Sequence, residues 1–185
     1  MSTYIFMKIL ESAPKRYDKG IRILALGKLE EAYHRLISSV EKRDRVLDIG
    51  CGTGTLTLMA AERRAHVRGI DMSAEMLQVA KEKTEKAHLS EKVEFSEKGV
   101  AELGAEVGES YNVAMSSLCF SELSEDELNF TLKEVMRILK SEGFFLVADE
   151  VKPEGIFKRI INFTMRIPLV IITYVITQKT EGGMK

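Results

Sequence analysis

The sequence predicts an α/β fold: a mostly parallel sheet with helices on both faces. Short apolar runs typical of buried strands alternate with stretches of helical period over residues 45–150. A glycine-rich turn, Gly50–Gly54, separates the first apolar run from a helical stretch. Acidic residues, Asp48 and Asp71, stand at the ends of the first two runs. Ligands of open α/β sheets bind at the carboxyl ends of the strands, so we expect the site there.

The stretch 45–55 joins a strand, a turn and the start of a helix. Its apolar residues and its alternate glycines are Val46, Leu47, Ile49, Gly50, Gly52 and Gly54. Glycine has no Cβ, so a ligand can lie directly on the backbone of such a turn. We therefore expect backbone N–H groups of the turn to be free and to point at the carboxyl edge of the sheet.

The glycine spacing and Asp48 decide the class of ligand. The glycines follow G-x-G-x-G, whereas a dinucleotide fold has G-x-G-x-x-G, whose last position is Thr55 here. Asp48 stands two residues before Gly50, where a carboxylate repels a pyrophosphate and favours a cation. An NAD-binding oxidoreductase is therefore disfavoured and a positively charged cofactor is expected. A tight turn without any ligand is the alternative.

The segment Val46–Gly54, Val-Leu-Asp-Ile-Gly-Cys-Gly-Thr-Gly, resembles the first motif of the class I S-adenosylmethionine-dependent methyltransferases. The resemblance covers 45–150 and implies a Rossmann-like methyltransferase sheet of order 3-2-1-4-5, with S-adenosyl-L-methionine as cofactor. Asp71 would accept hydrogen bonds from the ribose hydroxyls, and Met72 would pack against the adenine. The implied cofactor-binding residues are Asp48, Gly50, Cys51, Gly52, Gly54, Asp71, Met72, Val100 and Ser117.

The sequence departs from the family after the third predicted strand. The family places a Gly-Asp pair there, whose aspartate contacts the adenine amino group, but this chain has Lys98-Gly99-Val100. Glu97 or Glu102 could substitute for the missing carboxylate. We expect adenine recognition through the backbone around Val100.

The remaining elements follow the chain in order. A short helix over 4–10 and two helices between Pro14 and Val40 are expected to form an N-terminal cap over the ligand edge. Strands and helices are then expected over 46–49, 55–61, 66–71, 74–87, 92–96, 111–117, 124–139 and 144–149. Ser73 and Ser124 are the predicted N-caps, and 140–143 is the predicted turn into the last strand. The buried stripe expected on the helix after Ser124 is Leu128, Leu132, Val135, Met136 and Leu139.

Composition and charge exclude several classes of protein. The 185 residues carry 27 Lys and Arg against 28 Asp and Glu, so a net charge of −1 indicates no nucleic-acid partner. The cysteines, Cys51 and Cys119, with three histidines in the whole chain, predict neither a metal site nor a disulfide framework. Met1–Leu10 lacks the basic start and cleavage site of a signal peptide, so a cytoplasmic location is expected.

The C-terminal segment is amphipathic and then apolar. An apolar helical face is expected over Gly155–Arg166, and the apolar run Leu169–Thr177 after Pro168 is too short for a membrane span. We expect this run to pack over the active-site edge or against a second copy of the chain. Contact with a membrane surface is the less favoured alternative. The family normally adds strands six and seven here; both are expected to be missing, so the chain would be a fragment or would complete its sheet with a partner.

A single domain is expected over 1–185, with a helical cap (1–43), a cofactor-binding core (44–150) and the apolar C-terminal segment (151–185). The placement of that segment resembles the ubiquinone and menaquinone biosynthesis methyltransferases. Together with the N-terminal helices and Leu118–Leu123, it resembles the corrinoid protein-associated methyltransferases more narrowly.

The resemblance implies methyl transfer from S-adenosyl-L-methionine to a small-molecule acceptor. No Asn/Asp-Pro-Pro-aromatic motif is present, which disfavours methylation of a base or amide nitrogen. Glu122, Tyr17 and His34 are the candidate general bases, needed only where the acceptor must lose a proton. The alternative is a cofactor-binding partner protein without turnover, docking on a corrinoid protein.

Overall fold

A computed structural model describes residues 12–25 and 28–149 of the chain. The chain divides into two units, with the boundary after Glu31. The described part of the first unit holds helix α2 (Pro14–Leu24), which has proline in its first turn as expected, and the start of α3 (Lys28–Ser38). The second unit begins at Ala32 and contains the sheet. The helix predicted over 4–10 and the C-terminal segment lie outside the described residues.

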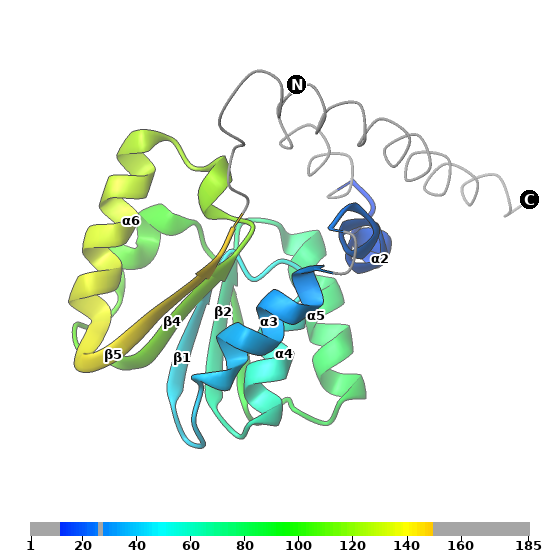
Figure 1. Ribbon diagram of the computed structural model, residues 1–185, viewed down its shortest axis with the longest axis horizontal. Coiled ribbons are helices and arrows are strands. Elements are labelled where there is room, and N and C mark those ends of the chain that lie inside the picture. The colour runs from blue at the N-terminus through cyan, green and yellow to red at the C-terminus, as the bar shows by residue number, and fades with distance from the viewer. Residues whose placement is uncertain (1–11, 26–27, 150–185) are drawn as a thin grey trace, which may run out of the picture. The chain divides into compact units, whose positions relative to one another are not determined.

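The second unit is built on a parallel sheet in the order β3-β2-β1-β4-β5, which confirms the expected topology (Figure 1). Its strands are β1 (Arg45–Ile49), β2 (His66–Asp71), β3 (Val93–Glu97), β4 (Tyr111–Ser117) and β5 (Leu139–Ala148). The central strand β1 reads as an apolar run because both of its faces are covered; Val46, Leu47 and Ile49 are fully buried.

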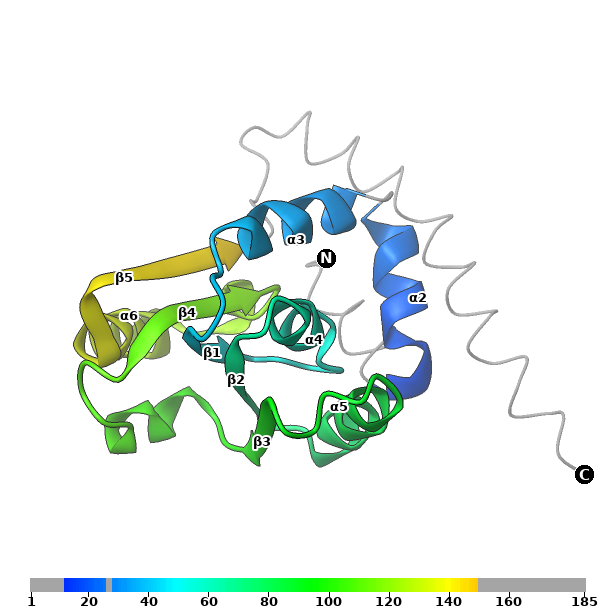
Figure 2. The same cartoon turned by 90° about the horizontal axis from the view of Figure 1, so that it is seen from below.

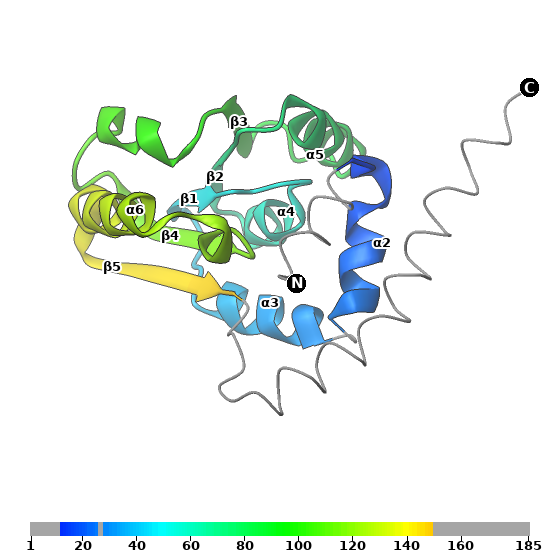
Figure 3. The same ribbon diagram turned by 90° about the horizontal axis from the view of Figure 1, so that it is seen from above.

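Helices cover both faces of this sheet (Figures 2 and 3). On one face, α3 and α4 (Thr55–Glu62) pack around a buried cluster that includes Ile37, Val46 and Leu56. On the other face, the 3₁₀ helix η1 (Val100–Ala105) and α6 (Glu125–Ile138) pack on Leu47 and Ile49. The remaining helix, α5 (Ala74–Lys86), packs beside β3. Every strand and helix predicted between 46 and 117 is therefore present.

The junction of α6 and β5 differs from the prediction. β5 begins immediately after α6 ends, so residues 140–143 belong to a strand and not to a turn. The pairing of β4 with β5 shifts register between Tyr111, opposite Leu139, and Val113, opposite Phe144. A bulge of this kind absorbs the extra residues that were assigned to the turn.

The buried face of α6 also differs from the expected stripe. Val135 is buried as predicted, but Leu132 is 39 % exposed and Met136 is 80 % exposed. Polar residues take part of the buried face instead, because the side of α6 that packs on η1 and the sheet carries Thr131 and Glu134. Hydrophobicity alone therefore misplaced the stripe.

β5 forms one edge of the sheet within the described residues. Two of its apolar side chains are open to solvent there, Phe144 at 57 % and Val147 at 40 % exposure. The helix expected over 155–166, which could cover this edge, and the run Leu169–Thr177, expected over the active-site edge or against a second copy of the chain, lie outside the described residues. Their packing stays a prediction. No helix in the described ranges is both long and apolar enough to cross a membrane.

Candidate functional site

The glycine turn after β1 is closed on one side and open on the other. Gly50 has φ +69° and Gly52 has φ +52°, both in the left-handed region that glycine favours. A Cβ on Gly50 would lie 2.5 Å from the Sγ atom of Cys119, so no side chain fits there. A Cβ on Gly52 would meet nothing within 4 Å. Packing therefore requires glycine at position 50, while Gly52 leaves room for a ligand.

The backbone N–H groups of this turn are not free, contrary to the prediction. Those of Gly50 and Cys51 both donate to the carbonyl oxygen of Ile70, at 2.9 and 3.0 Å. That of Gly52 donates to Oδ2 of Asp71 at 2.8 Å. The turn folds back on the end of β2, so these donors are used inside the protein. A pyrophosphate needs such donors, so this turn is poorly suited to a dinucleotide.

Asp48 lies beneath the turn, with 1 % of its surface exposed. Thr57, in the first turn of α4, donates its hydroxyl to the carboxylate at 2.5 Å and adds its backbone N–H. The carboxylate thus occupies the positive end of the α4 dipole, the position that a phosphate takes in a dinucleotide fold. The pKa of Asp48 is raised from 3.8 to about 7, mainly by burial; the charge of Asp71 contributes to this rise, and the hydrogen bonds from Thr57 oppose it. A cation near the turn would favour the ionised carboxylate.

Asp71 ties the glycine turn to α5. Its Oδ2 atom accepts from the Gly52 N–H at 2.8 Å, and its Oδ1 atom accepts from the Ser73 N–H at 2.9 Å. A carboxylate at the end of a strand such as β2 can accept hydrogen bonds from the hydroxyls of a ligand. Ser73 caps α5 as predicted, since its hydroxyl accepts from the Met76 N–H at 3.2 Å.

Met72 and the loop after β3 form a second wall beside Asp71. Met72 is 78 % exposed, a large apolar side chain left open at the ligand edge. The place that a Cβ on Gly99 would take lies 3.1 Å from Sδ of Met72 and 3.3 Å from Oε2 of Glu102. Glu102 also accepts from the Gly99 N–H at 2.9 Å. These distances place Glu102, one of the two expected substitutes for the missing carboxylate, near Met72. Val100 follows directly as the first residue of η1.

Comparison with known proteins identifies the family. A family model described as a methyltransferase domain matches residues 46–143. The chain belongs to this methyltransferase family.

Relatives and solved structures agree with this assignment. The ubiquinone/menaquinone biosynthesis C-methyltransferase UbiE of Campylobacter jejuni is 32 % identical over 150 residues, covering 75 % of this chain and 60 % of the relative. YcgJ of Bacillus subtilis is 27 % identical with a TM-score of 0.62, covering 74 % of this chain and 58 % of the other. A proposed S-adenosylmethionine-dependent methyltransferase of Listeria monocytogenes is 35 % identical with a TM-score of 0.57, covering 66 % and 54 %.

These matches confirm the class I resemblance and identify S-adenosyl-L-methionine as the cofactor of the family. The chain spans only about half of the length of the curated relatives it matches, between 43 and 60 % for the first of them. The narrower resemblance to the corrinoid protein-associated methyltransferases stays a prediction.

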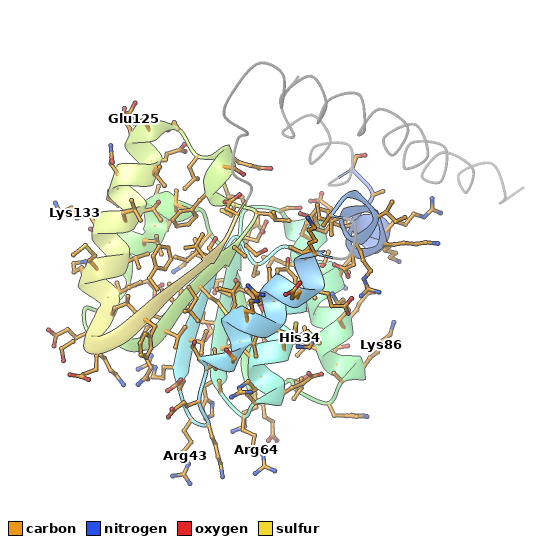
Figure 4. All side chains as sticks on the ribbon, viewed as in Figure 1. His34, Arg43, Arg64, Lys86, Glu125 and Lys133 are labelled. Atoms are coloured by element: carbon orange, nitrogen blue, oxygen red, sulfur yellow. The ribbon has the colours of Figure 1, made fainter. Side chains whose placement is uncertain are left out.

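In this chain, the end of β4 meets α3. The Ser117 hydroxyl donates to the Tyr33 hydroxyl oxygen at 2.8 Å, and the Ser116 hydroxyl donates to the Ile49 carbonyl oxygen at 2.7 Å. Tyr33 is half-buried, whereas His34 is exposed on α3 (Figure 4). Consecutive helical residues project about 100° apart, so Tyr33 and not His34 reaches the strand end.

The other candidate bases, Glu122 and Tyr17, belong to different units of the chain. Glu122 lies half-buried in the 3₁₀ helix η2 (Phe120–Glu122), and its charge helps raise the pKa of Cys119. Tyr17 belongs to α2 in the first unit, so its role stays a prediction. Burial is the main cause that raises the pKa of Cys119 to about 12 and that of Cys51 well above its ordinary value. Both thiols are therefore neutral and weakly nucleophilic at physiological pH.

The sequence analysis did not identify several side chains around the glycine turn. Lys83 reaches from α5 to the turn, where it donates to Oγ1 of Thr55 at 2.8 Å and to Oγ1 of Thr53 at 3.4 Å. Thr57 holds the buried carboxylate of Asp48. A hydroxyl just inside a helix after a strand-tip acid is a signal that could have identified Thr57. Nothing local identifies Lys83, because its partners lie on another element.

Proposed function

We propose that this chain carries the cofactor-binding part of an enzyme that transfers a methyl group from S-adenosyl-L-methionine to a small-molecule acceptor. The glycine turn is the observation that carries the proposal. Its N–H groups at Gly50, Cys51 and Gly52 are used internally, and a buried carboxylate stands where a phosphate would otherwise bind. This arrangement supports a cofactor without phosphate that carries positive charge.

Each part of the cofactor has matching residues along the carboxyl edge. Gly52 offers open space, and Asp48 provides a negative field beneath it. The carboxylate of Asp71, at the end of β2, would accept hydrogen bonds from the ribose hydroxyls. Met72 offers an exposed apolar surface for the adenine face, with Val100 and Glu102 beside it. When bound, the cofactor supplies an electrophilic methyl group on a sulfonium; the protein's contribution is chiefly alignment of donor and acceptor.

Three considerations support a small-molecule acceptor. The net charge of −1 provides no general attraction for nucleic acid. The sequence lacks the Asn/Asp-Pro-Pro-aromatic motif of nitrogen methylation. The UbiE relative is named for quinone biosynthesis and for C-methylation. A cytoplasmic location is part of the same proposal.

Titration calorimetry of the full chain with S-adenosylmethionine, S-adenosylhomocysteine and NAD tests the cofactor. We expect both sulfur cofactors to bind and NAD to be rejected. Preferential binding of NAD would overturn the proposal.

Incubation with methyl-labelled cofactor and the low-molecular-mass filtrate of a cell extract tests turnover. Label in a small molecule supports the proposal. Binding without consumption of the cofactor supports instead a partner protein without turnover, such as one that docks on a corrinoid protein. Label transferred only to macromolecules in whole extract would also contradict a small-molecule acceptor.

A further inference from the structure

The 3₁₀ helix η1 follows the wall formed by Met72 and Gly99. It is six residues long, although 3₁₀ hydrogen bonds rarely sustain more than about four residues. Among its residues, Leu103 is the one with a buried side chain. Val100, at the amino end, is partly buried against the same core cluster as Leu103, so the carboxyl end of η1 is the end that depends on polar contacts.

Arg137, on α6, holds the carboxyl end of η1. Its Nη2 atom donates to the carbonyl oxygens of Leu103, Gly104 and Glu106 at 3.1, 3.4 and 2.9 Å. A cation is favourable at the carbonyl end of a helix, where carbonyl groups lack partners. Glu134 orients the guanidinium by accepting from Nε of Arg137 at 2.7 Å. One side chain therefore satisfies the end of η1 from a separate helix.

The carboxylate of Glu106 fixes the residue after η1 to the sheet. It is only 9 % exposed and accepts from the Tyr111 hydroxyl at 2.8 Å and from Nη1 of Arg68 at 3.2 Å. Nζ of Lys98, on the other side of η1, lies 3.6 Å from its second oxygen. Desolvation, with the hydrogen bond to Glu106, raises the pKa of Tyr111 to about 12, so Tyr111 remains a donor to this carboxylate.

The amino end of η1 is joined to the ribose side of the site. The Lys98 N–H donates to the Asp71 carbonyl oxygen at 3.0 Å, and the Gly99 N–H donates to Glu102 at 2.9 Å. The segment 98–106, which contains η1, is thus fixed to the end of β2 at its amino end and to α6 at its carboxyl end. Movement at the α6 end would change the wall beside Met72 and leave the carboxylate of Asp71 in place.

We infer that Arg137 is a positioning residue that holds η1 as the wall against which the adenine of the cofactor is recognised. Its hydrogen bonds go to η1, Glu106 and Glu134, and none goes to a residue predicted to bind the cofactor. This inference rests on the proposed function. Loss of the guanidinium leaves carbonyl groups of η1 without their donor, so base recognition weakens while ribose binding persists.

The test compares the full chain and its variants in binding S-adenosylhomocysteine and S-inosylhomocysteine. The two differ in the base, where the 6-amino group and the N1 acceptor of adenine become a carbonyl oxygen and an N1–H donor in hypoxanthine. Arg137→Met keeps an unbranched apolar stem and removes the guanidinium donors. We expect its affinity for S-adenosylhomocysteine to fall about fivefold or more, and the preference for adenine over hypoxanthine to fall about threefold. Arg137→Lys, with one donor group, should lie between Arg137→Met and the wild type.

Two control variants separate positioning from general destabilisation. Glu134→Gln removes the charge but keeps a side-chain oxygen that accepts from Nε of Arg137, so the guanidinium stays on the η1 carbonyls and the wild-type preference for adenine should be kept. Val135→Ala opens a cavity at a buried position of the same helix, so it should lower the melting temperature without changing that preference.

An unchanged preference in Arg137→Met overturns the inference, as does an equal change in Val135→Ala. If Arg137→Met does not fold, Arg137→Lys decides by the same criterion. A wild-type chain that binds neither compound overturns the proposed function as well. Normal wild-type binding with an unchanged variant overturns only the role of Arg137.

Discussion

The Thr57 hydroxyl donates a hydrogen bond to the buried carboxylate of Asp48 at 2.5 Å, joining the tip of β1 to the first turn of α4. This bond opposes only part of the cost of burial, because the pKa of Asp48 still rises to about 7. A carboxyl group whose pKa is near 7 thus lies directly beneath the turn that is proposed to bind a cation.

Asp48 should make stability depend on pH. Its pKa is 3.8 in the unfolded chain and about 7 in the folded one. Between these values the folded state binds more protons, so the free energy of unfolding falls as the pH rises through this window. Across the whole window, the rise in the pKa of Asp48 lowers the free energy of unfolding by about 4 kcal/mol. Asp48→Asn should remove it, so the variant gains stability relative to wild type on going from about pH 4 to about pH 8.

Denaturant unfolding of both proteins at several pH values measures this difference. Glu91→Gln, at an exposed position, is the control and should follow the wild-type curve. Parallel stability curves for Asp48→Asn and wild type would show that Asp48 does not titrate in this range.

The two glycines of the turn should respond differently to alanine. Gly50→Ala places a methyl group 2.5 Å from Sγ of Cys119, and such overpacking should lower the free energy of unfolding by about 2–3 kcal/mol. Gly52→Ala meets no atom within 4 Å and should cost only the left-handed conformation, about 1 kcal/mol. Its methyl group enters the open side, so affinity for S-adenosylhomocysteine should still fall markedly.

Thermal unfolding and calorimetry on both variants measure the contrast. The assignment of the open side to the cofactor fails if Gly52→Ala binds S-adenosylhomocysteine like wild type. The packing role of Gly50 fails if Gly50→Ala is as stable as Gly52→Ala.

Local signals predicted most of the fold. The apolar runs of β1, β2 and β4 have no competing interpretation, and Ser73 and Ser124 cap their helices through their own neighbours in sequence. The β4–β5 bulge was not predicted from the sequence, because the register of a strand is set by its pairing with a neighbouring strand. The buried face of α6 was not predicted correctly, because it includes a charged residue, Glu134, which accepts a hydrogen bond from Arg137.

The elements that carry the candidate site could be predicted from the sequence, but the hydrogen bonds within it could not. The glycine turn follows β1 and Asp71 ends β2, as predicted; that these residues bind a cofactor stays a prediction. Whether the N–H groups of the turn are used inside the protein depends on how closely the end of β2 lies to the turn. The hydrogen bonds that hold η1 join Arg137 to Leu103, 34 residues away in the sequence. Such contacts follow from the tertiary structure alone.

Asp71 should combine a ligand role with a structural one. Asp71→Ala removes the acceptor for the Gly52 and Ser73 N–H groups and for the ribose hydroxyls. Charge-assisted bonds are worth roughly 1.5–3 kcal/mol each, so affinity for S-adenosylhomocysteine should fall by about tenfold or more. Asp71→Asn keeps one acceptor oxygen and should lie between.

Ser73→Ala is the matched control for Asp71. It removes the α5 cap, worth about 1 kcal/mol, but keeps the backbone N–H that meets Asp71. It should therefore lose stability and retain affinity. Wild-type affinity in Asp71→Ala, with an intact circular dichroism spectrum, would remove Asp71 from the site.

The hydrogen bond between Ser117 and Tyr33 should couple α3 to the end of β4. Tyr33→Phe and Ser117→Ala each remove one partner of a half-buried pair at 2.8 Å, so the double variant should cost less than the sum of the two. The coupling expected in the free energy of unfolding is about 0.5–1.5 kcal/mol. His34→Ala, one residue away but exposed, should change nothing. Repeating the cycle on the affinity for S-adenosylhomocysteine asks whether the pair also lines the cofactor site. Coupling in stability alone would make it a structural tie, and additive effects in both measurements would show that the two hydroxyls do not act together.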